Sequence, residues 1–360
     1  MIFGSFCFGL FCFCLYFFAL YGIKPAQSSN YGINNFSVSQ CNNLKGVFAV
    51  FVVLHHISQC LYAYETDKPF DLLFRFIYGH GNYATSVFFL ISGYGLAVQF
   101  LTHGKEYIKS FPKKRLLSVL IPLLLAFFIY WCISWIYTKV SFKTAFLSLL
   151  GGQPIISNSW YVLSIIYFYI AFFITAVVVG NNKKPLFIAS VTSFWVIFCV
   201  YCLARGYNSW WITTAHCFVI GIILGMYREK IAETVCSYYT ATVAAVLAVL
   251  AVFEILNLFS VNSVYINSAV TVCRTALFSV LIVLLSLKFK IGNTAVRFIG
   301  GISYELYLIH GIVIGLLLNY KILPRYGDVV FVVLALVLSL ISAVLYNAAD
   351  RLIFKVIRRQ

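Results

Sequence analysis

The sequence predicts an all-α membrane protein, a polytopic bundle of about eleven spanning helices. Of its 360 residues, 62% are hydrophobic and 10% are charged, and the mean hydropathy is +0.94. A soluble domain carries charge on about a quarter of its residues, because its surface must face water. The apolar residues also form long blocks, such as VVFVVLALVLSLISAVL at 329–345. Blocks of this length cross a bilayer as helices, so a soluble enzyme is excluded.

Eleven apolar windows are long enough to cross the membrane. They lie near residues 2–23, 44–63, 83–102, 116–138, 160–180, 185–204, 210–227, 238–259, 268–287, 302–319 and 329–350.

The first window differs from the others. It starts at Met1 without a positively charged segment, and the Ala-Gln-Ser at 26–28 resembles a signal-peptide cleavage site. A cytoplasmic Lys45, which the charge pattern requires, instead favours a retained helix with its N-terminus outside. We therefore assign residues 1–37 to an extra N-terminal helix and linker, and residues 38–360 to the ten-helix membrane domain.

The charge pattern orients the helices. The net charge is +16, and basic residues of membrane proteins collect in cytoplasmic loops, so we attribute the excess to topology rather than to nucleic acid. Attraction to anionic membrane lipid accounts for part of the positive excess. The segment 103–115 has five Lys or Arg against one Glu and is placed inside. Counting spans from it puts the C-terminus inside as well. We expect a multi-pass protein of the cell membrane, of the bacterial inner-membrane kind.

Ionisable side chains inside hydrocarbon are costly, and each is therefore a functional candidate. Lys45 and His56 stand eleven residues apart in LKGVFAVFVVLHH, about 16 Å along a helix. Eleven steps of roughly 100° return to nearly the same face, whereas His55 points roughly 80° away. This spacing selects His56 as the partner of Lys45. A cation at the membrane surface and an imidazole three turns deeper suit a ligand with an anionic head and a reactive tail, such as acyl-coenzyme A.

This helix resembles the first core helix of the type 3 integral-membrane acyltransferases, bacterial O-acyltransferases of sugars and polysaccharides. That helix carries a basic residue, ten intervening residues and a histidine. Lys45 stands where the family usually has arginine, which keeps the charge but loses the bidentate fork. Ser118 stands where many members have the second arginine of an R-x-x-R run. Further stretches match the family in order over roughly residues 38–350, namely FFLISGYGL (88–96), FPKKRLLSVLIP (111–122), SWYVLSIIYFY (159–169) and ISYELYLIHG (302–311).

The resemblance implies that residues 38–360 form a membrane acyltransferase domain. It would move an acetyl or other short acyl group from cytoplasmic acyl-coenzyme A, acetyl-coenzyme A in the first instance, to a hydroxyl of a glycan or other carbohydrate. His56 would act as general base, since a buried histidine stays neutral and can accept the hydroxyl proton. No metal is expected, because the histidines lack the clustering of membrane di-metal sites.

Other polar residues are candidates for binding the two substrates. For the coenzyme these are Lys45, Lys113, Lys114 and Arg115, and for the acceptor or in a supporting role they are Ser92, Trp160, Tyr161, Arg274, Ser303, Tyr307 and His310. The basic run 113–115 could bind phosphates or only signal topology. Ser303, Tyr307 and His310 share one stripe of a helix and could orient His56, bind the acceptor or hold helices together.

Two of these candidates, Ser92 and Arg274, could instead have structural roles. Ser92 lies beside Gly93 and Gly95, which favour a close approach of helices or a kink as well as a ligand-lining role. Arg274 could pair with Glu254 in the outer half of the bilayer. Alternatively, both line an acceptor groove together with tryptophans that otherwise belong to the interfacial belt.

Two other functions use the same buried polar residues. A transporter or flippase of a lipid-linked sugar or a polyol is the main alternative, although the repeated halves and broken helices of transporters are not evident. A membrane sensor or assembly partner is the other, and it would predict that Lys45 and His56 tolerate substitution.

Overall fold

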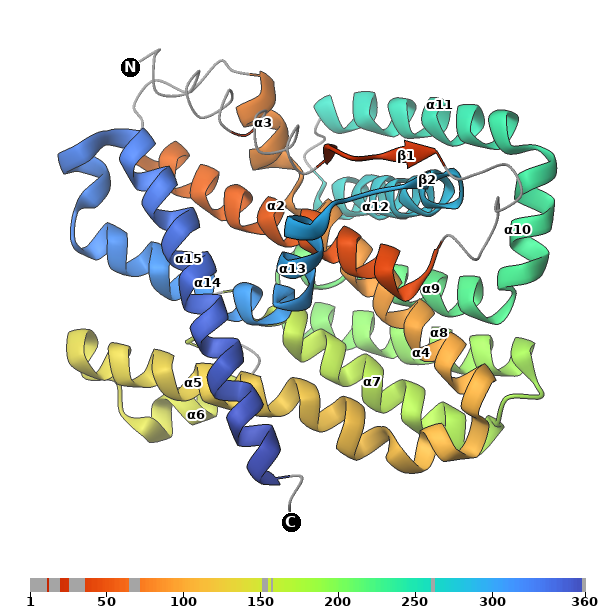
Figure 1. Ribbon diagram of the computed structural model, residues 1–360, viewed down its shortest axis with the longest axis horizontal. Coiled ribbons are helices and arrows are strands. Elements are labelled where there is room, and N and C mark those ends of the chain that lie inside the picture. The colour runs from red at the N-terminus through yellow and green to blue at the C-terminus, as the bar shows by residue number, and fades with distance from the viewer. Residues whose placement is uncertain are drawn as a thin grey trace.

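The computed structural model describes residues 12, 20–25, 36–64, 72–150, 155–156, 158–259 and 263–357 (Figure 1). Nearly all of them are helical, which confirms the all-α class. The elements in chain order are β1 (Lys24–Pro25), α2 (Val38–Tyr64), α3 (Leu72–Gly79), α4 (Gly81–Phe111), the π-helical turn η3 (Pro112–Leu116), α5 (Leu117–Thr138), α6 (Phe142–Leu150), α7 (Trp160–Val179), α8 (Lys184–Ala204), the 3₁₀ turn η4 (Ser209–Trp211), α9 (His216–Met226), α10 (Arg228–Ser237), α11 (Tyr239–Leu258), α12 (Val264–Lys288), β2 (Phe289–Lys290), α13 (Thr294–Gly301), α14 (Ser303–Asn319) and α15 (Ile322–Ile357).

The count of spans differs from the eleven that the sequence predicts. Within the described residues, eight helical stretches are long and apolar enough to cross a membrane, or nine if the bent pair α13–α14 forms one span. The window 2–23 lies outside the described residues except for Cys12 and 20–23. Two other windows, 83–102 and 116–138, fall in one helical run, Gly81–Thr138.

That run is long enough for both windows. Its 58 residues would measure about 87 Å if straight, against roughly 30 Å of hydrocarbon. Gly104 has non-helical dihedral angles and interrupts α4 between the two windows. Figure 1 shows α5 running back from the end of α4. The two windows therefore correspond to two segments, α4 and α5, that continuous helical hydrogen bonding joins into one run.

The first half of α2 is fixed by polar side chains and by glycine. The Asn43 amide donates to the carbonyl of Ile291, the residue after β2, at 2.7 Å. The Gln40 side chain donates to the carbonyl of Phe289 and accepts from the N–H of Ile291. A Cβ on Gly300 of α13 would collide with the backbone oxygen of Asn42, so only glycine permits this approach. These contacts bring Lys45 close to the start of α14.

Helices α4 and α9 cross at paired glycines. A Cβ on Gly93 would collide with the backbone oxygen of Phe218, and one on Gly221 with that of Leu90. Small residues let helix backbones approach closely in membranes, and Gly93 serves this purpose here. Gly95 differs, because a Cβ there would meet no atom of the described residues within 4 Å. It leaves free space beside α4.

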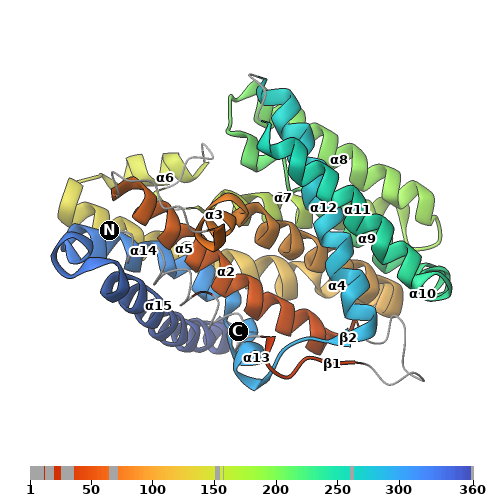
Figure 2. The same cartoon turned by 90° about the horizontal axis from the view of Figure 1, so that it is seen from above.

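Helix α11 lies at one edge of the bundle, beside α12 (Figures 1 and 2). None of its residues is buried, and its apolar surface is of the kind that faces lipid. Its one acidic residue, Glu254, reaches Arg274 of α12. The ion pair is therefore a polar attachment of an otherwise apolar edge helix.

Candidate active site

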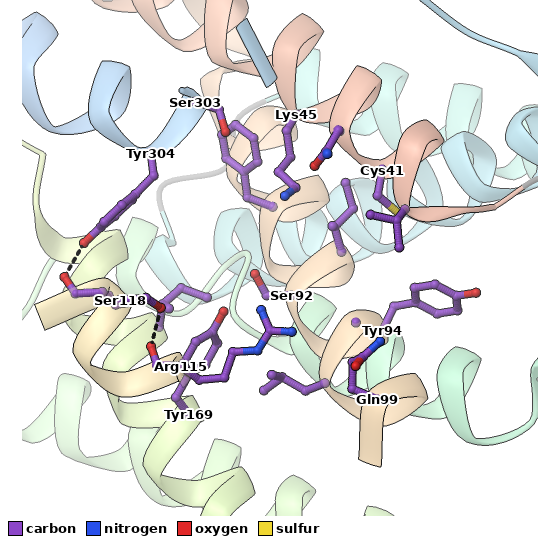
Figure 3. A pocket seen from close by; sticks show the side chains of 18 of the residues that line it. Cys41, Lys45, Ser92, Tyr94, Gln99, Arg115, Ser118, Tyr169, Ser303 and Tyr304 are labelled. Carbon is purple, nitrogen blue, oxygen red and sulfur yellow. Dashed lines mark hydrogen bonds between the residues drawn. The ribbon is translucent and has the colours of Figure 1, made fainter. Parts of the chain in front are cut away.

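A cavity of about 410 Å³ lies between α2, α4, η3, α7 and α14. Figure 3 shows Lys45 reaching into it from α2 and Arg115 from η3, with Ser92 of α4 between them. Neither cation forms an ion pair with any residue that the structure describes. Two unpaired cations facing one cavity within an apolar bundle favour an anionic ligand.

Arg115 is held in place by its neighbours. Its Nε donates to the Tyr107 hydroxyl at 3.1 Å, and its guanidinium carbon lies 5.8 Å from the centre of that ring. A second cavity of about 470 Å³ adjoins the first and shares Gln99 and Arg115 with it. Lys114 lines this second cavity. Lys113 is exposed and lines neither of the two.

The structure brings together most of the residues predicted for the substrates. Those that line the first cavity are Lys45, Ser92, Arg115, Tyr161, Ser303 and Tyr307. Trp160 packs edge-on against Tyr161, with ring centres 6.2 Å apart, and is not a lining residue. Asn42, Tyr94, Gln99 and Tyr169 also line the cavity, and sequence reasoning did not select them. They lie on helices whose cavity-facing sides depend on tertiary packing.

His56 and His310 form a stacked pair. Their ring centres lie 5.2 Å apart with an interplanar angle of 21°. His310 is fully buried, its Nδ1 lies 3.0 Å from the carbonyl of Leu306, and its Nε2 has no hydrogen-bond partner among the described residues. His56 is half-buried, and its Nδ1 lies 2.8 Å from Oε1 of Gln59. The structure therefore brings these two predicted histidines together from helices that are 254 positions apart in the sequence.

His55 serves a different purpose from its neighbour. Its Nδ1 lies 3.0 Å from the carbonyl of Ile77 in α3, and its ring fills the space beside Gly81, where any Cβ would collide with it. This contact holds α3 and the start of α4 against α2. The helical spacing that separated His55 from His56 agrees with these positions.

Tyr307 connects the cavity to the histidine pair. It lines the cavity, its ring centre lies 5.9 Å from that of His310, and its hydroxyl donates to the Asn158 carbonyl at 2.5 Å. Asn158 has a φ of 61°, in the left-handed region that asparagine tolerates, and its side-chain nitrogen lies 3.5 Å from Nδ1 of His56. His56 itself is not a lining residue, and Asn158 and His310 connect it to Tyr307 of the cavity lining.

Arg274 lies away from this cavity. Its side chain is 2% exposed, and its Nη2 donates to Glu254 at 2.7 Å. Nε2 of His80 lies 3.3 Å from the same carboxylate, and the Tyr83 hydroxyl donates to its other oxygen. Of the two arrangements that the sequence allows for Arg274, the structure shows the ion pair.

Comparison with known proteins gives the reaction class. The model of a protein family described as an acyltransferase domain, type 3, matches residues 38–348, nearly the whole of the chain. The chain belongs to this acyltransferase family. No curated protein and no solved structure gave a significant match.

Membership in the type 3 acyltransferases decides between the functions considered from the sequence. The protein is a membrane acyltransferase, and the transporter alternative is not supported. The matched segment contains both the cavity and the histidine pair. The cavity of this acyltransferase also has the size of an ordinary small-molecule site, typically about 300–1,000 Å³.

Proposed function

We propose that this acyltransferase moves an acetyl or other short acyl group from cytoplasmic acyl-coenzyme A to a hydroxyl of a glycan or other carbohydrate, with His56 as general base. The observation that carries the proposal is the path from Lys45 and Arg115, through the cavity, to Tyr307 and the histidine pair. Cations stand at one end of this path and imidazoles at the other.

The charges fit the coenzyme better than a neutral ligand. Its phosphates would lie between Lys45 and Arg115, with Lys114 available in the adjoining cavity. Charge-assisted bonds from such donors to phosphate oxygens are stronger than neutral ones. The pantetheine arm would then follow the cavity past Ser92 and Tyr161, and the thioester would lie near Tyr307.

The transfer follows from this placement. The acceptor hydroxyl oxygen attacks the thioester carbonyl carbon while a ring nitrogen of His56 takes the hydroxyl proton. A C–O bond forms, the C–S bond breaks, and the thiolate takes the proton back from the imidazolium as it leaves. The products are the acylated acceptor and free coenzyme A, so no metal or redox partner is consumed.

The acceptor would approach from the other end of α2. His56 is half-buried, and Gln59, one turn further from Lys45, is exposed. With Lys45 at the cytoplasmic end, that exposed end faces the outer side of the membrane. Donor and acceptor would then enter from opposite sides, and the acyl group would cross the membrane during transfer.

Filling the cavity should block the donor. Gly95 lines the cavity and a Cβ there meets no atom, so Gly95→Leu is expected to fold normally and to raise KM for acetyl-coenzyme A at least about tenfold. The matched control is Gly315→Leu, because a Cβ on Gly315 also meets no atom of the described residues within 4 Å, but Gly315 does not line the cavity. Initial rates at varied acetyl-coenzyme A measure both. Equal KM values in the two variants would place the donor elsewhere.

The basic run offers a test of phosphate binding against topology. Arg115→Gln is expected to raise KM for acetyl-coenzyme A roughly tenfold, because a charge-assisted bond to phosphate is lost. Lys113→Gln removes the same charge two residues away, at an exposed position outside both cavities. The same rate measurements should show a KM close to wild type for Lys113→Gln. Equal effects of both changes would favour a purely topological role.

The activity itself is tested with purified protein in lipid nanodiscs. Radiolabelled acetyl-coenzyme A and cell-envelope glycan from cells lacking the protein are supplied, and acetate released from the glycan by mild alkali is counted. Label in the glycan supports the proposal. Thioester cleavage without label in any carbohydrate would contradict the acceptor class, and an intact thioester would contradict the donor.

A further inference from the structure

Gln59 lies one helical turn beyond His56 on α2, on the side away from Lys45. Its carboxamide oxygen Oε1 lies 2.8 Å from Nδ1 of His56, a good hydrogen-bond distance. A carboxamide oxygen only accepts, so in this contact Nδ1 carries the hydrogen. A neutral imidazole with hydrogen on Nδ1 has its lone pair on Nε2.

We propose that Gln59 is a positioning residue for His56, which fixes the Nδ1–H tautomer and leaves Nε2 as the basic nitrogen. This inference rests on the proposed function of His56. Because Gln59 lies further from Lys45 than His56 does, the bond turns the Nδ1 edge of the ring away from the donor end. Nε2, on another edge of the ring, is then free for the acceptor hydroxyl.

The other neighbours of His56 do not fix its tautomer. Nδ2 of Asn158 lies 3.5 Å from the same Nδ1, at the outer limit of a hydrogen bond. Nδ1 cannot donate to Gln59 and accept from Asn158 together, and the shorter contact dominates. His310 meets His56 ring to ring, and its own Nδ1 faces the carbonyl of Leu306. His55 is tilted against His56 at 5.1 Å and is engaged with α3.

Catalysis depends on which ring nitrogen of His56 carries the hydrogen. With hydrogen on Nδ1, Nε2 takes the acceptor's proton and later returns it to the leaving thiolate, while the Nδ1–H bond to Gln59 persists throughout. With the other tautomer, Nε2 would already carry hydrogen and could not act as base. A change of tautomer therefore lowers turnover without altering how the donor binds.

The test uses the full-length protein in nanodiscs with Gln59→Leu, Gln59→Glu and His56→Ala. Gln59→Leu removes the hydrogen-bond acceptor for Nδ1–H of His56. It is expected to lower kcat roughly tenfold with KM for acetyl-coenzyme A unchanged. Gln59→Glu keeps an oxygen acceptor for Nδ1–H and should retain kcat within about threefold. His56→Ala gives the rate without the base.

A second measurement reads the tautomer independently of activity. In protein labelled with ¹⁵N-histidine, the His56 signals are assigned by their loss in His56→Ala. Their shifts should report Nδ1–H in the wild type and in Gln59→Glu, and a loss of that preference in Gln59→Leu. The other five histidines give the folding control, because their signals should keep their wild-type shifts in Gln59→Leu if that variant is folded.

The outcomes separate this inference from the proposed function. Wild-type kcat in Gln59→Leu, a fall in KM and kcat together, or a wild-type tautomer in that variant would each overturn the role of Gln59. A wild type that transfers no acetyl from acetyl-coenzyme A would instead overturn the proposed function, and the NMR result would still decide whether Gln59 sets the tautomer.

Discussion

His56→Ala is expected to lower acyl transfer by roughly 10²- to 10⁴-fold, which is the usual contribution of a positioned general base. The loss should appear in kcat, because Lys45 and Arg115 still line the donor cavity. KM for acetyl-coenzyme A should stay near its wild-type value. Ester-linked acetate on envelope glycan, normalised to the amount of folded protein, measures the effect in cells.

His55→Ala is the matched control, because it removes the neighbouring imidazole from the same helix. His55 contacts the Ile77 carbonyl and packs beside Gly81, so its loss is expected to reduce the yield of folded protein. Transfer per folded molecule should remain close to that of the wild type. Full transfer by His56→Ala, or an equal loss of transfer per molecule in both variants, would contradict a base at position 56.

Glu254→Gln is expected to destabilise the protein by roughly 3 kcal/mol, because it leaves a buried guanidinium without its counter-charge. Arg274 is 2% exposed and Glu254 is 33% exposed, so we expect the lower end of the usual range of about 3–5 kcal/mol. The bond also attaches the apolar edge helix α11 to α12. Thermal unfolding in detergent, followed by size-exclusion chromatography, measures the loss.

Two further variants make this measurement decisive. Glu106→Gln breaks the exposed pair with Lys109, whose side chains are 78% and 74% exposed, and should change stability by about 1 kcal/mol at most. The double change Glu254→Gln with Arg274→Met removes the buried charge as well and should recover most of the stability. Equal unfolding temperatures for Glu254→Gln and Glu106→Gln would rule out a supporting role for the ion pair.

Features that depend on one helix could be predicted from the sequence. Helical spacing put Lys45 and His56 on one face and turned His55 away, and the structure shows Lys45 at the cavity and His56 at His310. The stripe from Ser303 to His310 likewise faces this region. Gln59 stands three residues after His56, a helical spacing that favours a side-chain contact, but it was not among the residues selected from the sequence.

Features that depend on two or more helices were not predictable in the same way. Asn158 contacts both His56 of α2 and Tyr307 of α14, and no local pattern joins these positions. Whether Arg274 forms an ion pair or lines a groove depends on how α11 packs on α12, which the sequence does not indicate. Two predicted windows form one helical run because the hydrogen-bonded backbone continues through η3, which a hydropathy window does not register.

The bond between Tyr307 and Asn158 also has a consequence for the membrane itself. A cavity that opens at one end of α2 and a half-exposed histidine near its other end would form a leak if they were continuous. Each elementary charge that crosses dissipates about 2.3 kcal/mol per 100 mV of membrane potential. Tyr307 lines the cavity and contacts His310, and its hydroxyl donates to the Asn158 carbonyl. Under the proposed function, a neutral acyl group would be handed over at this position while the Tyr307 side chain blocks a continuous path for ions.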